Sequence, residues 1–241
     1  MCSDLRGSRM IRLVTFDAAN TIIEHSWDPA RLAIEAANDC DLKINEDVAR
    51  QHYLEVYGLM RGEHEELEKG GESSAIQAFW KRCIATWLER QGIDPIYSRE
   101  IVAYCQREVY SNESQMWNVF LDVLPTINTL RSRGIKAGII SNWDHSLHQV
   151  LKVLGLNDKF DFVIASLEFG FEKPAVEIFE EALRLSNENA SVSLHVGDSW
   201  EDDVIGAKNA GFEWLHLDRN MPTDLSKKRV QSLCDLLEMV T

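Results

Sequence analysis

The most constraining feature of this sequence is a regular alternation, beginning near residue 122, between short apolar runs and stretches with helical spacing. The apolar runs have the lengths of buried strands, and the helical stretches begin at acids or proline and end at glycines or apolar residues. The expected strands are Ile135–Ser141, Phe160–Ala165, Val192–Val196 and Trp214–Leu217. Strands and helices that alternate in this way form βαβ units, so we predict an α/β protein with a Rossmann-like parallel sheet.

A further apolar run, which ends at Asp17, is expected to belong to the same sheet. Residues 28–112, which follow it, show only helical spacing. Four helix starts are indicated by capping residues or an early proline, at Asp28-Pro29, Asn45, Ser74 and Ser98. We therefore expect a core of residues 10–24 and 115–241, and a helical insertion of residues 25–114.

Composition narrows the classes of function. The 241 residues carry a formal net charge of −14, which argues against a nucleic-acid binder or a protein that binds anionic membranes. No run of about 18 apolar residues predicts a membrane span. The five cysteines lie singly, as is typical of a reducing compartment, and the stretch Met1–Met10 lacks the apolar core of a secretory signal. We expect a cytoplasmic protein, with a mitochondrial or nuclear location and the oligomeric state left open.

Polar side chains follow successive strands of the predicted sheet. Each has an ordinary explanation as a turn residue, a helix cap or a solvated lysine. Ligands of open α/β sheets, however, bind at the carboxyl ends of the strands, where these residues arrive in order. The residues are Asp17, the pair Ser141-Asn142, Lys173, and the acids Asp198, Asp202 and Asp203. Together they predict a site for a small anionic substrate. By contrast, the acidic run Glu63–Glu68 is expected to form an exposed helix end.

Four sequence motifs carry a family resemblance that covers nearly the whole chain. They are FDAANT at Phe16–Thr21, IISN at Ile139–Asn142, EKP at Glu172–Pro174 and VGDSWEDD at Val196–Asp203. In this order and spacing they resemble the signatures of the haloacid dehalogenase (HAD) superfamily of hydrolases. The helical insertion is similar to the C1 cap of that superfamily, which implies an α/β core with an inserted helical cap.

The resemblance implies a nucleophile and a metal site. Asp17 would attack phosphorus or carbon to form an aspartyl ester. The carboxylates of Asp17 and Asp198, with the main-chain carbonyl of Ala19, would hold one Mg²⁺, which prefers such oxygen ligands.

The resemblance also implies groups for a phosphorylated substrate. Ser141 and Lys173 would contact the transferring phosphoryl group, with Asn142 and Asn20 as further substrate-binding residues. Asp202 or Asp203 would orient Lys173 or the water on the metal, and the sequence does not choose between them.

Position 19 departs from the pattern. Phosphatases of this superfamily usually carry a second Asp there, which protonates the leaving alcohol and then activates water. This chain has Ala19, and its methyl group transfers no proton. Because general acid–base catalysis typically contributes about 10²–10⁴-fold, a phosphatase mechanism would be slowed by roughly that factor. His25, close in sequence, is the candidate substitute for the missing acid.

Three functional hypotheses follow. The first is a Mg²⁺-dependent hydrolase of a small phosphorylated metabolite. The second is a dehalogenase- or phosphonatase-type hydrolase, which needs no acid at position 19; the acid at Asp198 argues against dehalogenation. The third is a catalytically impaired protein that binds a phosphorylated ligand or a protein partner, although retention of Asp17, Ser141, Lys173 and Asp198 argues against complete loss of the site.

Overall fold

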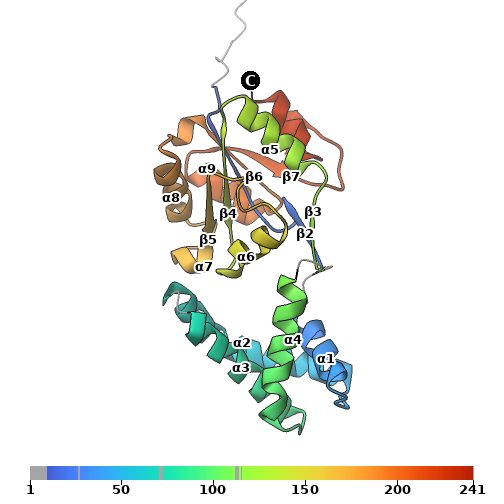
Figure 1. Ribbon diagram of the computed structural model, residues 1–241. Helices are drawn as coiled ribbons and strands as arrows, with labels where there is room; N and C mark the ends of the chain where they lie inside the picture. The colour runs from blue at the N-terminus through green and yellow to red at the C-terminus, as the bar shows by residue number, and fades with distance from the viewer. Residues whose placement is uncertain (1–9, 27, 71–72, 112–113, 115, 241) are drawn as a thin grey trace, which may run out of the picture. The chain divides into compact units, whose positions relative to one another are not determined.

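The computed structural model describes residues 10–26, 28–70, 73–111, 114 and 116–240. The chain divides into two compact units (Figure 1). The sheet unit combines Met1–His25 with Asn118–Thr241, and the helical unit is Ser26–Trp117. The helical unit is therefore an insertion in the chain that forms the sheet unit. Among the described residues, no helix combines the length and apolar character needed to cross a membrane.

The sheet unit is built on a six-stranded, all-parallel sheet with the order β5-β4-β1-β6-β7-β8. Its strands are β1 (Leu13–Phe16), β4 (Lys136–Ser141), β5 (Phe162–Ala165), β6 (Ser193–Gly197), β7 (Glu213–Leu217) and β8 (Arg229–Val230). The prediction of an α/β fold with a parallel sheet is confirmed. Every residue of β1 is buried, as expected for a central strand covered on both faces.

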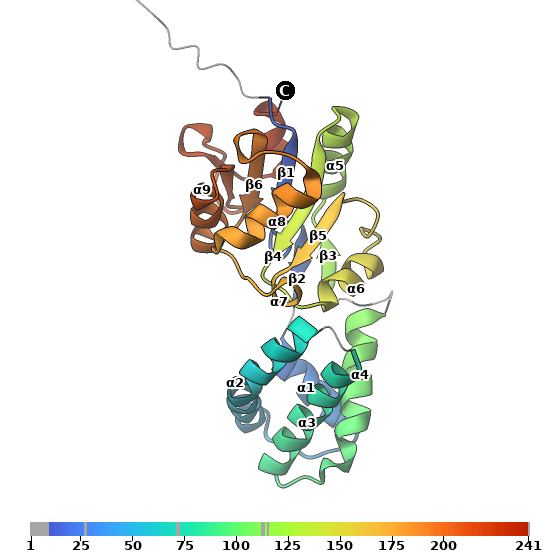
Figure 2. The same ribbon diagram turned by 90° about the vertical axis from the view of Figure 1, so that its left-hand side faces the viewer.

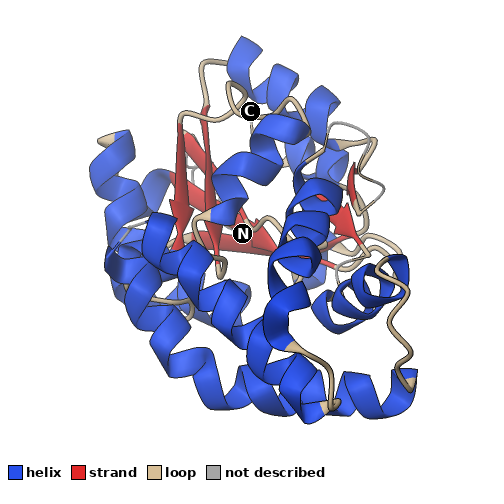
Figure 3. Ribbon diagram, turned by 60° about the horizontal axis from the view of Figure 1, so that its bottom comes forward, coloured by secondary structure: helices blue, strands red, loops and turns tan. Residues whose placement is uncertain are grey.

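The helices of the sheet unit cover both faces of the sheet. Helices α5 and α6 lie on one side, and α8 and α9 lie on the other (Figure 2). In Figure 3 the strands, in red, gather between the helices of this unit. The helices are α5 (Val123–Ser132), α6 (Ser146–Val153), the short α7 (Ser166–Phe169), α8 (Val176–Ser186) and α9 (Gly206–Asn209), which follows a π-helical turn, η3 (Trp200–Ile205). Two 3₁₀ turns, η2 (Ala190–Val192) and η4 (Leu225–Lys227), precede β6 and β8.

The helical unit contains four α-helices, as its pattern of helix starts predicts. They are α1 (Pro29–Asp39), α2 (Glu46–Gly70), α3 (Ser73–Arg90) and α4 (Ser98–Tyr110), with a 3₁₀ turn, η1 (Pro95–Tyr97), before α4. Asp28 caps α1 by accepting a hydrogen bond from the Arg31 amide. Trp87 is fully buried, and its indole N–H donates to the Ala49 carbonyl at 2.8 Å. The unit therefore has an apolar core of its own.

The structure contains two short strands that the sequence pattern does not predict. Strands β2 (Ile23–His25) and β3 (Trp117–Val119) pair with each other where the chain leaves and re-enters the sheet unit. The segment that follows β7 holds further elements. The segment contains β8 and a 3₁₀ helix, η5 (Leu233–Glu238), which Ser232 and Asp235 begin with a capping box.

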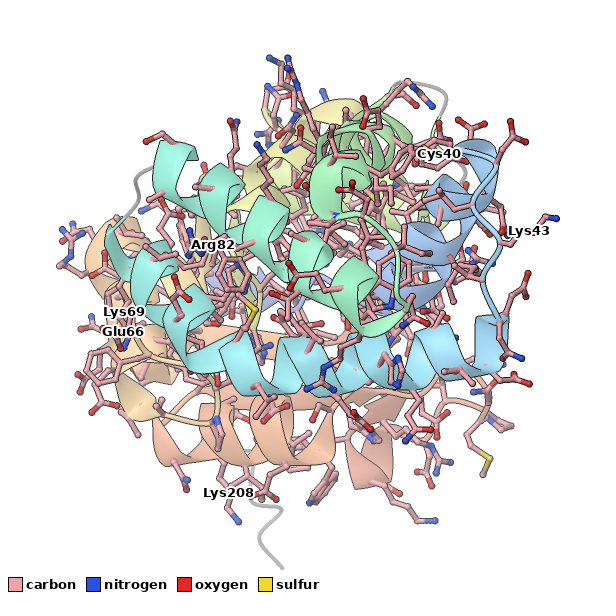
Figure 4. All side chains as sticks on the ribbon, turned by 90° about the horizontal axis from the view of Figure 1, so that it is seen from below. Cys40, Lys43, Glu66, Lys69, Arg82 and Lys208 are labelled. Atoms are coloured by element: carbon pink, nitrogen blue, oxygen red, sulfur yellow. The ribbon has the colours of Figure 1, made fainter. Side chains whose placement is uncertain are left out.

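The acidic run Glu63–Glu68 is not a uniformly exposed helix end. Glu63 pairs with Arg82, and Glu66 accepts a hydrogen bond from Lys69 at 2.8 Å, all on α2 and α3 (Figure 4). Glu68 is instead fully buried, and its carboxylate lies 3.1 Å from the imidazole of His64, also buried. The expectation fails at Glu68 because i,i+4 spacing on the helix brings it beside His64.

Gly206 begins α9 where this helix meets α8. A Cβ atom at Gly206 would lie 2.8 Å from the ring of Phe179 and 3.0 Å from the main-chain Cα of Pro174. Phe179 is fully buried, so neither neighbour can move away freely. The contact lies next to Lys173 in sequence and fixes the segment that carries this lysine.

We expect Gly206→Ala to lower the free energy of unfolding by about 1–3 kcal/mol, because it overpacks this contact. Gly62→Ala is the matched control: it lies on the exposed face of α2 with open space around it, and helix propensity should raise stability by about 0.5–1 kcal/mol. Urea unfolding followed by circular dichroism measures both. An unchanged unfolding midpoint for Gly206→Ala would show that the contact is not close-packed.

Candidate active site

The site is built at the carboxyl edge of the sheet, where three neighbouring strands end together. Strand β1 lies between β4 and β6, and Phe16 is in register with Ile139 on one side and Val196 on the other. The amide of Asp17 donates to the carbonyl of Val196 at 3.0 Å, so the sheet pairing continues to this residue. The parallel register therefore brings the residues that follow each strand to one place.

Lys173 joins the carboxylates of this edge. Its Nζ lies 2.7 Å from Oδ1 of Asp17 and 2.5 Å from Oδ1 of Asp203. The hydroxyl of Ser141 donates to the same oxygen of Asp17 at 3.1 Å. Lys173 is 4% exposed, Asp17 7% and Asp203 1%. The sequence places these four residues far apart, and the structure brings them into one buried cluster.

The surroundings shift the pKa values of Asp17 and Asp203 in opposite directions. Burial, together with the charges of Asp203 and Asp198, raises the pKa of Asp17 to about 7, although Lys173 opposes the shift. Burial also acts to raise the pKa of Asp203, but Lys173 and His195 outweigh it and hold that pKa well below its usual range. Burial acts to lower the pKa of Lys173, and the two carboxylates overcome it and raise that pKa. Lys173 and Asp203 are therefore held in their charged forms, whereas the surroundings of Asp17 favour its neutral form more than those of an ordinary carboxyl do.

Asp203, rather than Asp202, faces Lys173. The π-helical turn η3 leaves Asp202 half-buried, with Oδ2 accepting from the Ser199 hydroxyl at 3.2 Å. Asp203 lies on the inner side of the turn, where the Ser199 amide donates to its Oδ2 at 2.9 Å. The alternative that the sequence left open is thus decided by the geometry of the turn.

Two predicted substrate-binding residues contact other site residues. The side chain of Asn142 pairs with the main chain of Lys173, accepting at 2.7 Å and donating at 2.9 Å. Asn20 is in the left-handed conformation at φ 56°, and its side chain acts to lower the pKa of Asp198 against the effect of burial. The structure therefore gives Asn142 a part in holding the lysine loop and places Asn20 beside Asp198.

Ala19 and His25 lie on the turn and strand that follow β1. Ala19 is half-buried and forms an isolated parallel bridge with Ile23. His25 is half-buried at the end of β2.

A possible metal site contains three carboxylates. One oxygen from each of Asp17, Asp198 and Asp203 lies within 4.8 Å of the others. Burial and the neighbouring Asp203 raise the pKa of Asp198. Against these three carboxylates, Lys173 supplies one positive charge, which leaves two negative charges when all are ionised. Oxygen ligands with this net charge suit Mg²⁺.

An arginine that no sequence motif reveals holds the turn after β1. The guanidinium of Arg219 donates to the carbonyl of Thr21 at 2.7 Å and to that of Asn20 at 3.3 Å. It also pairs with both oxygens of Asp122 and stacks 3.6 Å above the centre of the Phe120 ring. Nothing in the sequence marks this arginine, because its partners lie about 100 and 200 residues away along the chain.

Burial acts to raise the pKa of Asp122, but hydrogen bonds from Arg219, Ser232 and the Leu233 amide lower it overall. The ionised carboxylate therefore favours the folded state. Its contribution is complete above the unfolded pKa of about 4 and is lost as pH falls through the lower folded pKa.

We expect Arg219→Met to lower the free energy of unfolding by about 1–3 kcal/mol at pH 7, because the charged hydrogen bonds of the Asp122 carboxylate are lost. The difference from wild type should shrink as the pH is lowered below about 4. Denaturant unfolding at a series of pH values measures both effects. Arg184→Met, which breaks an exposed pair with Glu181, is the control and should change stability by no more than about 1 kcal/mol. A loss that is independent of pH would contradict the charge pairing.

The fold and the cluster define an α/β protein with a carboxylate–lysine site at the switch point of a parallel sheet. The sequence matches the family model for haloacid dehalogenase-like hydrolase over residues 11–211, and the chain therefore belongs to this hydrolase family. The resemblance carried by the four motifs is confirmed.

Individual proteins extend this comparison. Haloacid dehalogenase-like hydrolase domain-containing protein 3 of Homo sapiens is 28% identical over 206 residues, which cover 84% of this chain and 80% of that protein. Glyceraldehyde 3-phosphate phosphatase of Methanopyrus kandleri is 26% identical over 244 residues, which cover 94% and 92%. The crystal structure of 2-haloacid dehalogenase from Pseudomonas syringae pv. Tomato superposes with a TM-score of 0.68 at 25% identity, covering 96% and 98%.

Proposed function

We propose that this chain is a Mg²⁺-dependent hydrolase of small phosphorylated metabolites that uses Asp17 as its nucleophile. The observation that carries the proposal is the buried lysine between two carboxylates, with Ser141 on the same oxygen of Asp17. Among the similar proteins, one is named as a phosphatase of a three-carbon sugar phosphate, which fits a small phosphorylated substrate. In this proposal the helical unit is the cap that contributes specificity.

The charge of the cluster supports a divalent ion. Asp17, Asp198 and Ala19, through its main-chain carbonyl, would hold Mg²⁺. The bound ion would offset the two excess negative charges and polarise the phosphoryl oxygens. Burial is the main cause of the raised pKa of Asp17, and the charges of Asp203 and Asp198 add to it, which a bound cation would oppose.

The proposed chemistry begins with attack of an Asp17 carboxylate oxygen on phosphorus. A new P–O bond forms to Asp17, and the bond to the leaving oxygen breaks with its electron pair. Lys173 and Ser141 hold the transferring oxygens and stabilise the charge that develops on them. Water then cleaves the aspartyl phosphate to release inorganic phosphate and restore Asp17. Asp203 and Asn142 keep Lys173 in place through its side chain and main chain.

The dehalogenase alternative has one specific observation in its favour, the 2-haloacid dehalogenase that shares the fold at 25% identity. Asp198 argues against it, because this carboxylate adds a further negative charge where a haloacid would bring another. The binding alternative predicts a ligand-competent site without turnover. A single set of assays separates these possibilities.

We expect the EDTA-treated protein to be inactive on p-nitrophenyl phosphate, to regain activity with Mg²⁺, and to lose at least about 10²-fold in kcat in Asp17→Asn, which removes the nucleophile. Asp158→Asn, an exposed acid paired with Lys159, is the matched control and should keep wild-type activity. Chloride release from 2-chloropropionate without metal would establish the dehalogenase alternative. Calorimetric binding of phosphate to a protein that turns over neither compound would establish the binding alternative.

Because position 19 is an alanine, a second expectation concerns how the leaving oxygen is protonated. Lys173 and Asp203 are both held in their charged forms, so the lysine retains its proton and the carboxylate has none to give. Asp198 is assigned to the metal. These three groups therefore do not donate a proton to a leaving oxygen. A leaving group must then depart as an anion unless His25 protonates it. We propose that substrates whose leaving groups are weakly basic are strongly preferred.

Across a series of aryl phosphates, kcat/KM should fall steeply as the pKa of the leaving phenol rises. Ala19→Asp should flatten the slope and accelerate the most basic leaving group by about 10²–10⁴-fold, because it supplies an acid. Ala19→Asn, of the same size but without a transferable proton, should keep the steep slope. A shallow slope in wild type would show that another group donates the proton, and steepening in His25→Ala would identify it as His25.

A further inference from the structure

A buried histidine lies directly behind the lysine cluster. His195 is the third residue of β6, is 1% exposed, and is in register with Thr15 of the central strand β1. Its ring packs edge-on against Phe179, with centroids 5.1 Å apart. Its neighbours along the strand, Leu194 and Val196, are apolar and buried. An imidazole in such a position costs free energy unless both of its nitrogens have partners.

Both nitrogens of His195 have partners. Nε2 lies 3.1 Å from Oδ1 of Asp203, and Nδ1 lies 2.8 Å from the hydroxyl oxygen of Thr15. A neutral imidazole carries one proton, and burial favours the neutral ring by lowering the pKa of His195 although Asp203 opposes the shift. An ionised carboxylate only accepts hydrogen bonds, which puts that proton on Nε2. Nδ1 then accepts from Thr15, whose other acceptor, the Leu194 carbonyl, lies farther away at 3.4 Å.

Asp203 is thereby held by three donors. Oδ1 accepts from Lys173 and from His195, and Oδ2 accepts from the Ser199 amide. Gly197 also makes room for it, since a Cβ there would lie 2.1 Å from the Asp203 carboxyl carbon. The carboxylate has one orientation in which all three donors are satisfied. That orientation directs Oδ1 at the ammonium group shared with Asp17.

We propose that Thr15 and His195 form a buried hydrogen-bond relay that positions Lys173 through Asp203. Thr15 fixes the imidazole, the imidazole fixes Oδ1 of Asp203, and Oδ1 fixes the Lys173 ammonium beside Asp17. His195 and Thr15 are positioning residues, because their side-chain hydrogen bonds go to each other, to Asp203 and to the Leu194 carbonyl rather than to Asp17. The catalytic part of the inference rests on the proposed function, whereas the geometric part does not.

The relay predicts an effect on rate rather than on substrate affinity. Without the Thr15 hydroxyl or the Nε2–H donor, Asp203 can rotate and the lysine loses its fixed place between the two carboxylates. Lys173 stabilises charge that develops during transfer, so a displacement of this kind lowers kcat and leaves KM little changed. Displacements of about 1 Å in such groups cost up to about 10²-fold.

The test compares four relay variants and one control variant with wild type. Thr15→Val removes the hydroxyl at constant shape and should lower kcat about 10-fold or more, whereas Thr15→Ser keeps the hydroxyl and should recover most of the rate. His195→Gln retains an N–H donor and should recover more activity than His195→Leu, which has none. Ser193→Ala is the control. It removes one buried hydroxyl from the same strand, whose partner is the carbonyl of Asn189, and should leave kcat unchanged.

Nitrogen-15 NMR provides a readout independent of turnover. In wild type, His195 should be neutral with its proton on Nε2, and the Lys173 ammonium should give a slowly exchanging signal. Thr15→Val and His195→Leu should shift that signal or speed its exchange, and Ser193→Ala should not. A proton on Nδ1, a doubly protonated ring, or a Lys173 signal unchanged in both variants would overturn the relay.

The two proposals fail in different ways. A wild-type protein without phosphatase activity overturns the proposed function, and the NMR signals then decide the relay by themselves. An active wild type whose Thr15→Val variant loses no more rate than Ser193→Ala overturns the relay and leaves the function intact. If the loss of kcat follows the loss of unfolding free energy across all of these variants, His195 contributes to stability alone.

Discussion

The structure of the site depends on one buried ammonium group. Lys173 brings a positive charge to the carboxyl edge of the sheet, where water is excluded, and burial alone would disfavour its charged form. Asp17 and Asp203 reverse that preference from two sides. Removing the lysine would leave two buried carboxylates without a counter-ion, which costs far more than the ion pairs contribute. The lysine, its loop and two strand ends are therefore interdependent.

That interdependence explains the unequal character of the two acids. Asp203 contacts Lys173, His195 and the Ser199 amide, and it is the acid that stays ionised. Asp17 shares the same lysine, but burial, together with the charges of Asp203 and Asp198, raises its pKa. One carboxylate thus serves as a fixed counter-ion, while the other retains reactivity that a cation or a substrate can alter. Identical side chains acquire different tasks from their hydrogen bonds.

The sequence predicts the fold and the members of the cluster better than their contacts. A parallel sheet brings the carboxyl ends of neighbouring strands together, so Asp17 and Ser141 could be assigned to one site from strand order alone. The choice between Asp202 and Asp203 depends on how a π-helical turn rotates its side chains, which no residue pattern encodes. Arg219 was missed because tertiary packing brings it to distant carbonyls, and Glu68 was misjudged because its i,i+4 neighbour His64 is itself buried.

Two sets of contacts hold the segment that contains Ala19, and neither involves its side chain. Behind the site, Thr15 on β1 is tied to His195, and beyond it Arg219 binds the carbonyls of Asn20 and Thr21. Both act on the main chain or on residues flanking position 19. The side chain there can therefore change from an acid to a methyl group without disturbing the placement of Asp17. Under the proposed function, the groups that hold charge are therefore separable from an acid at position 19, and this chain has the first without the second.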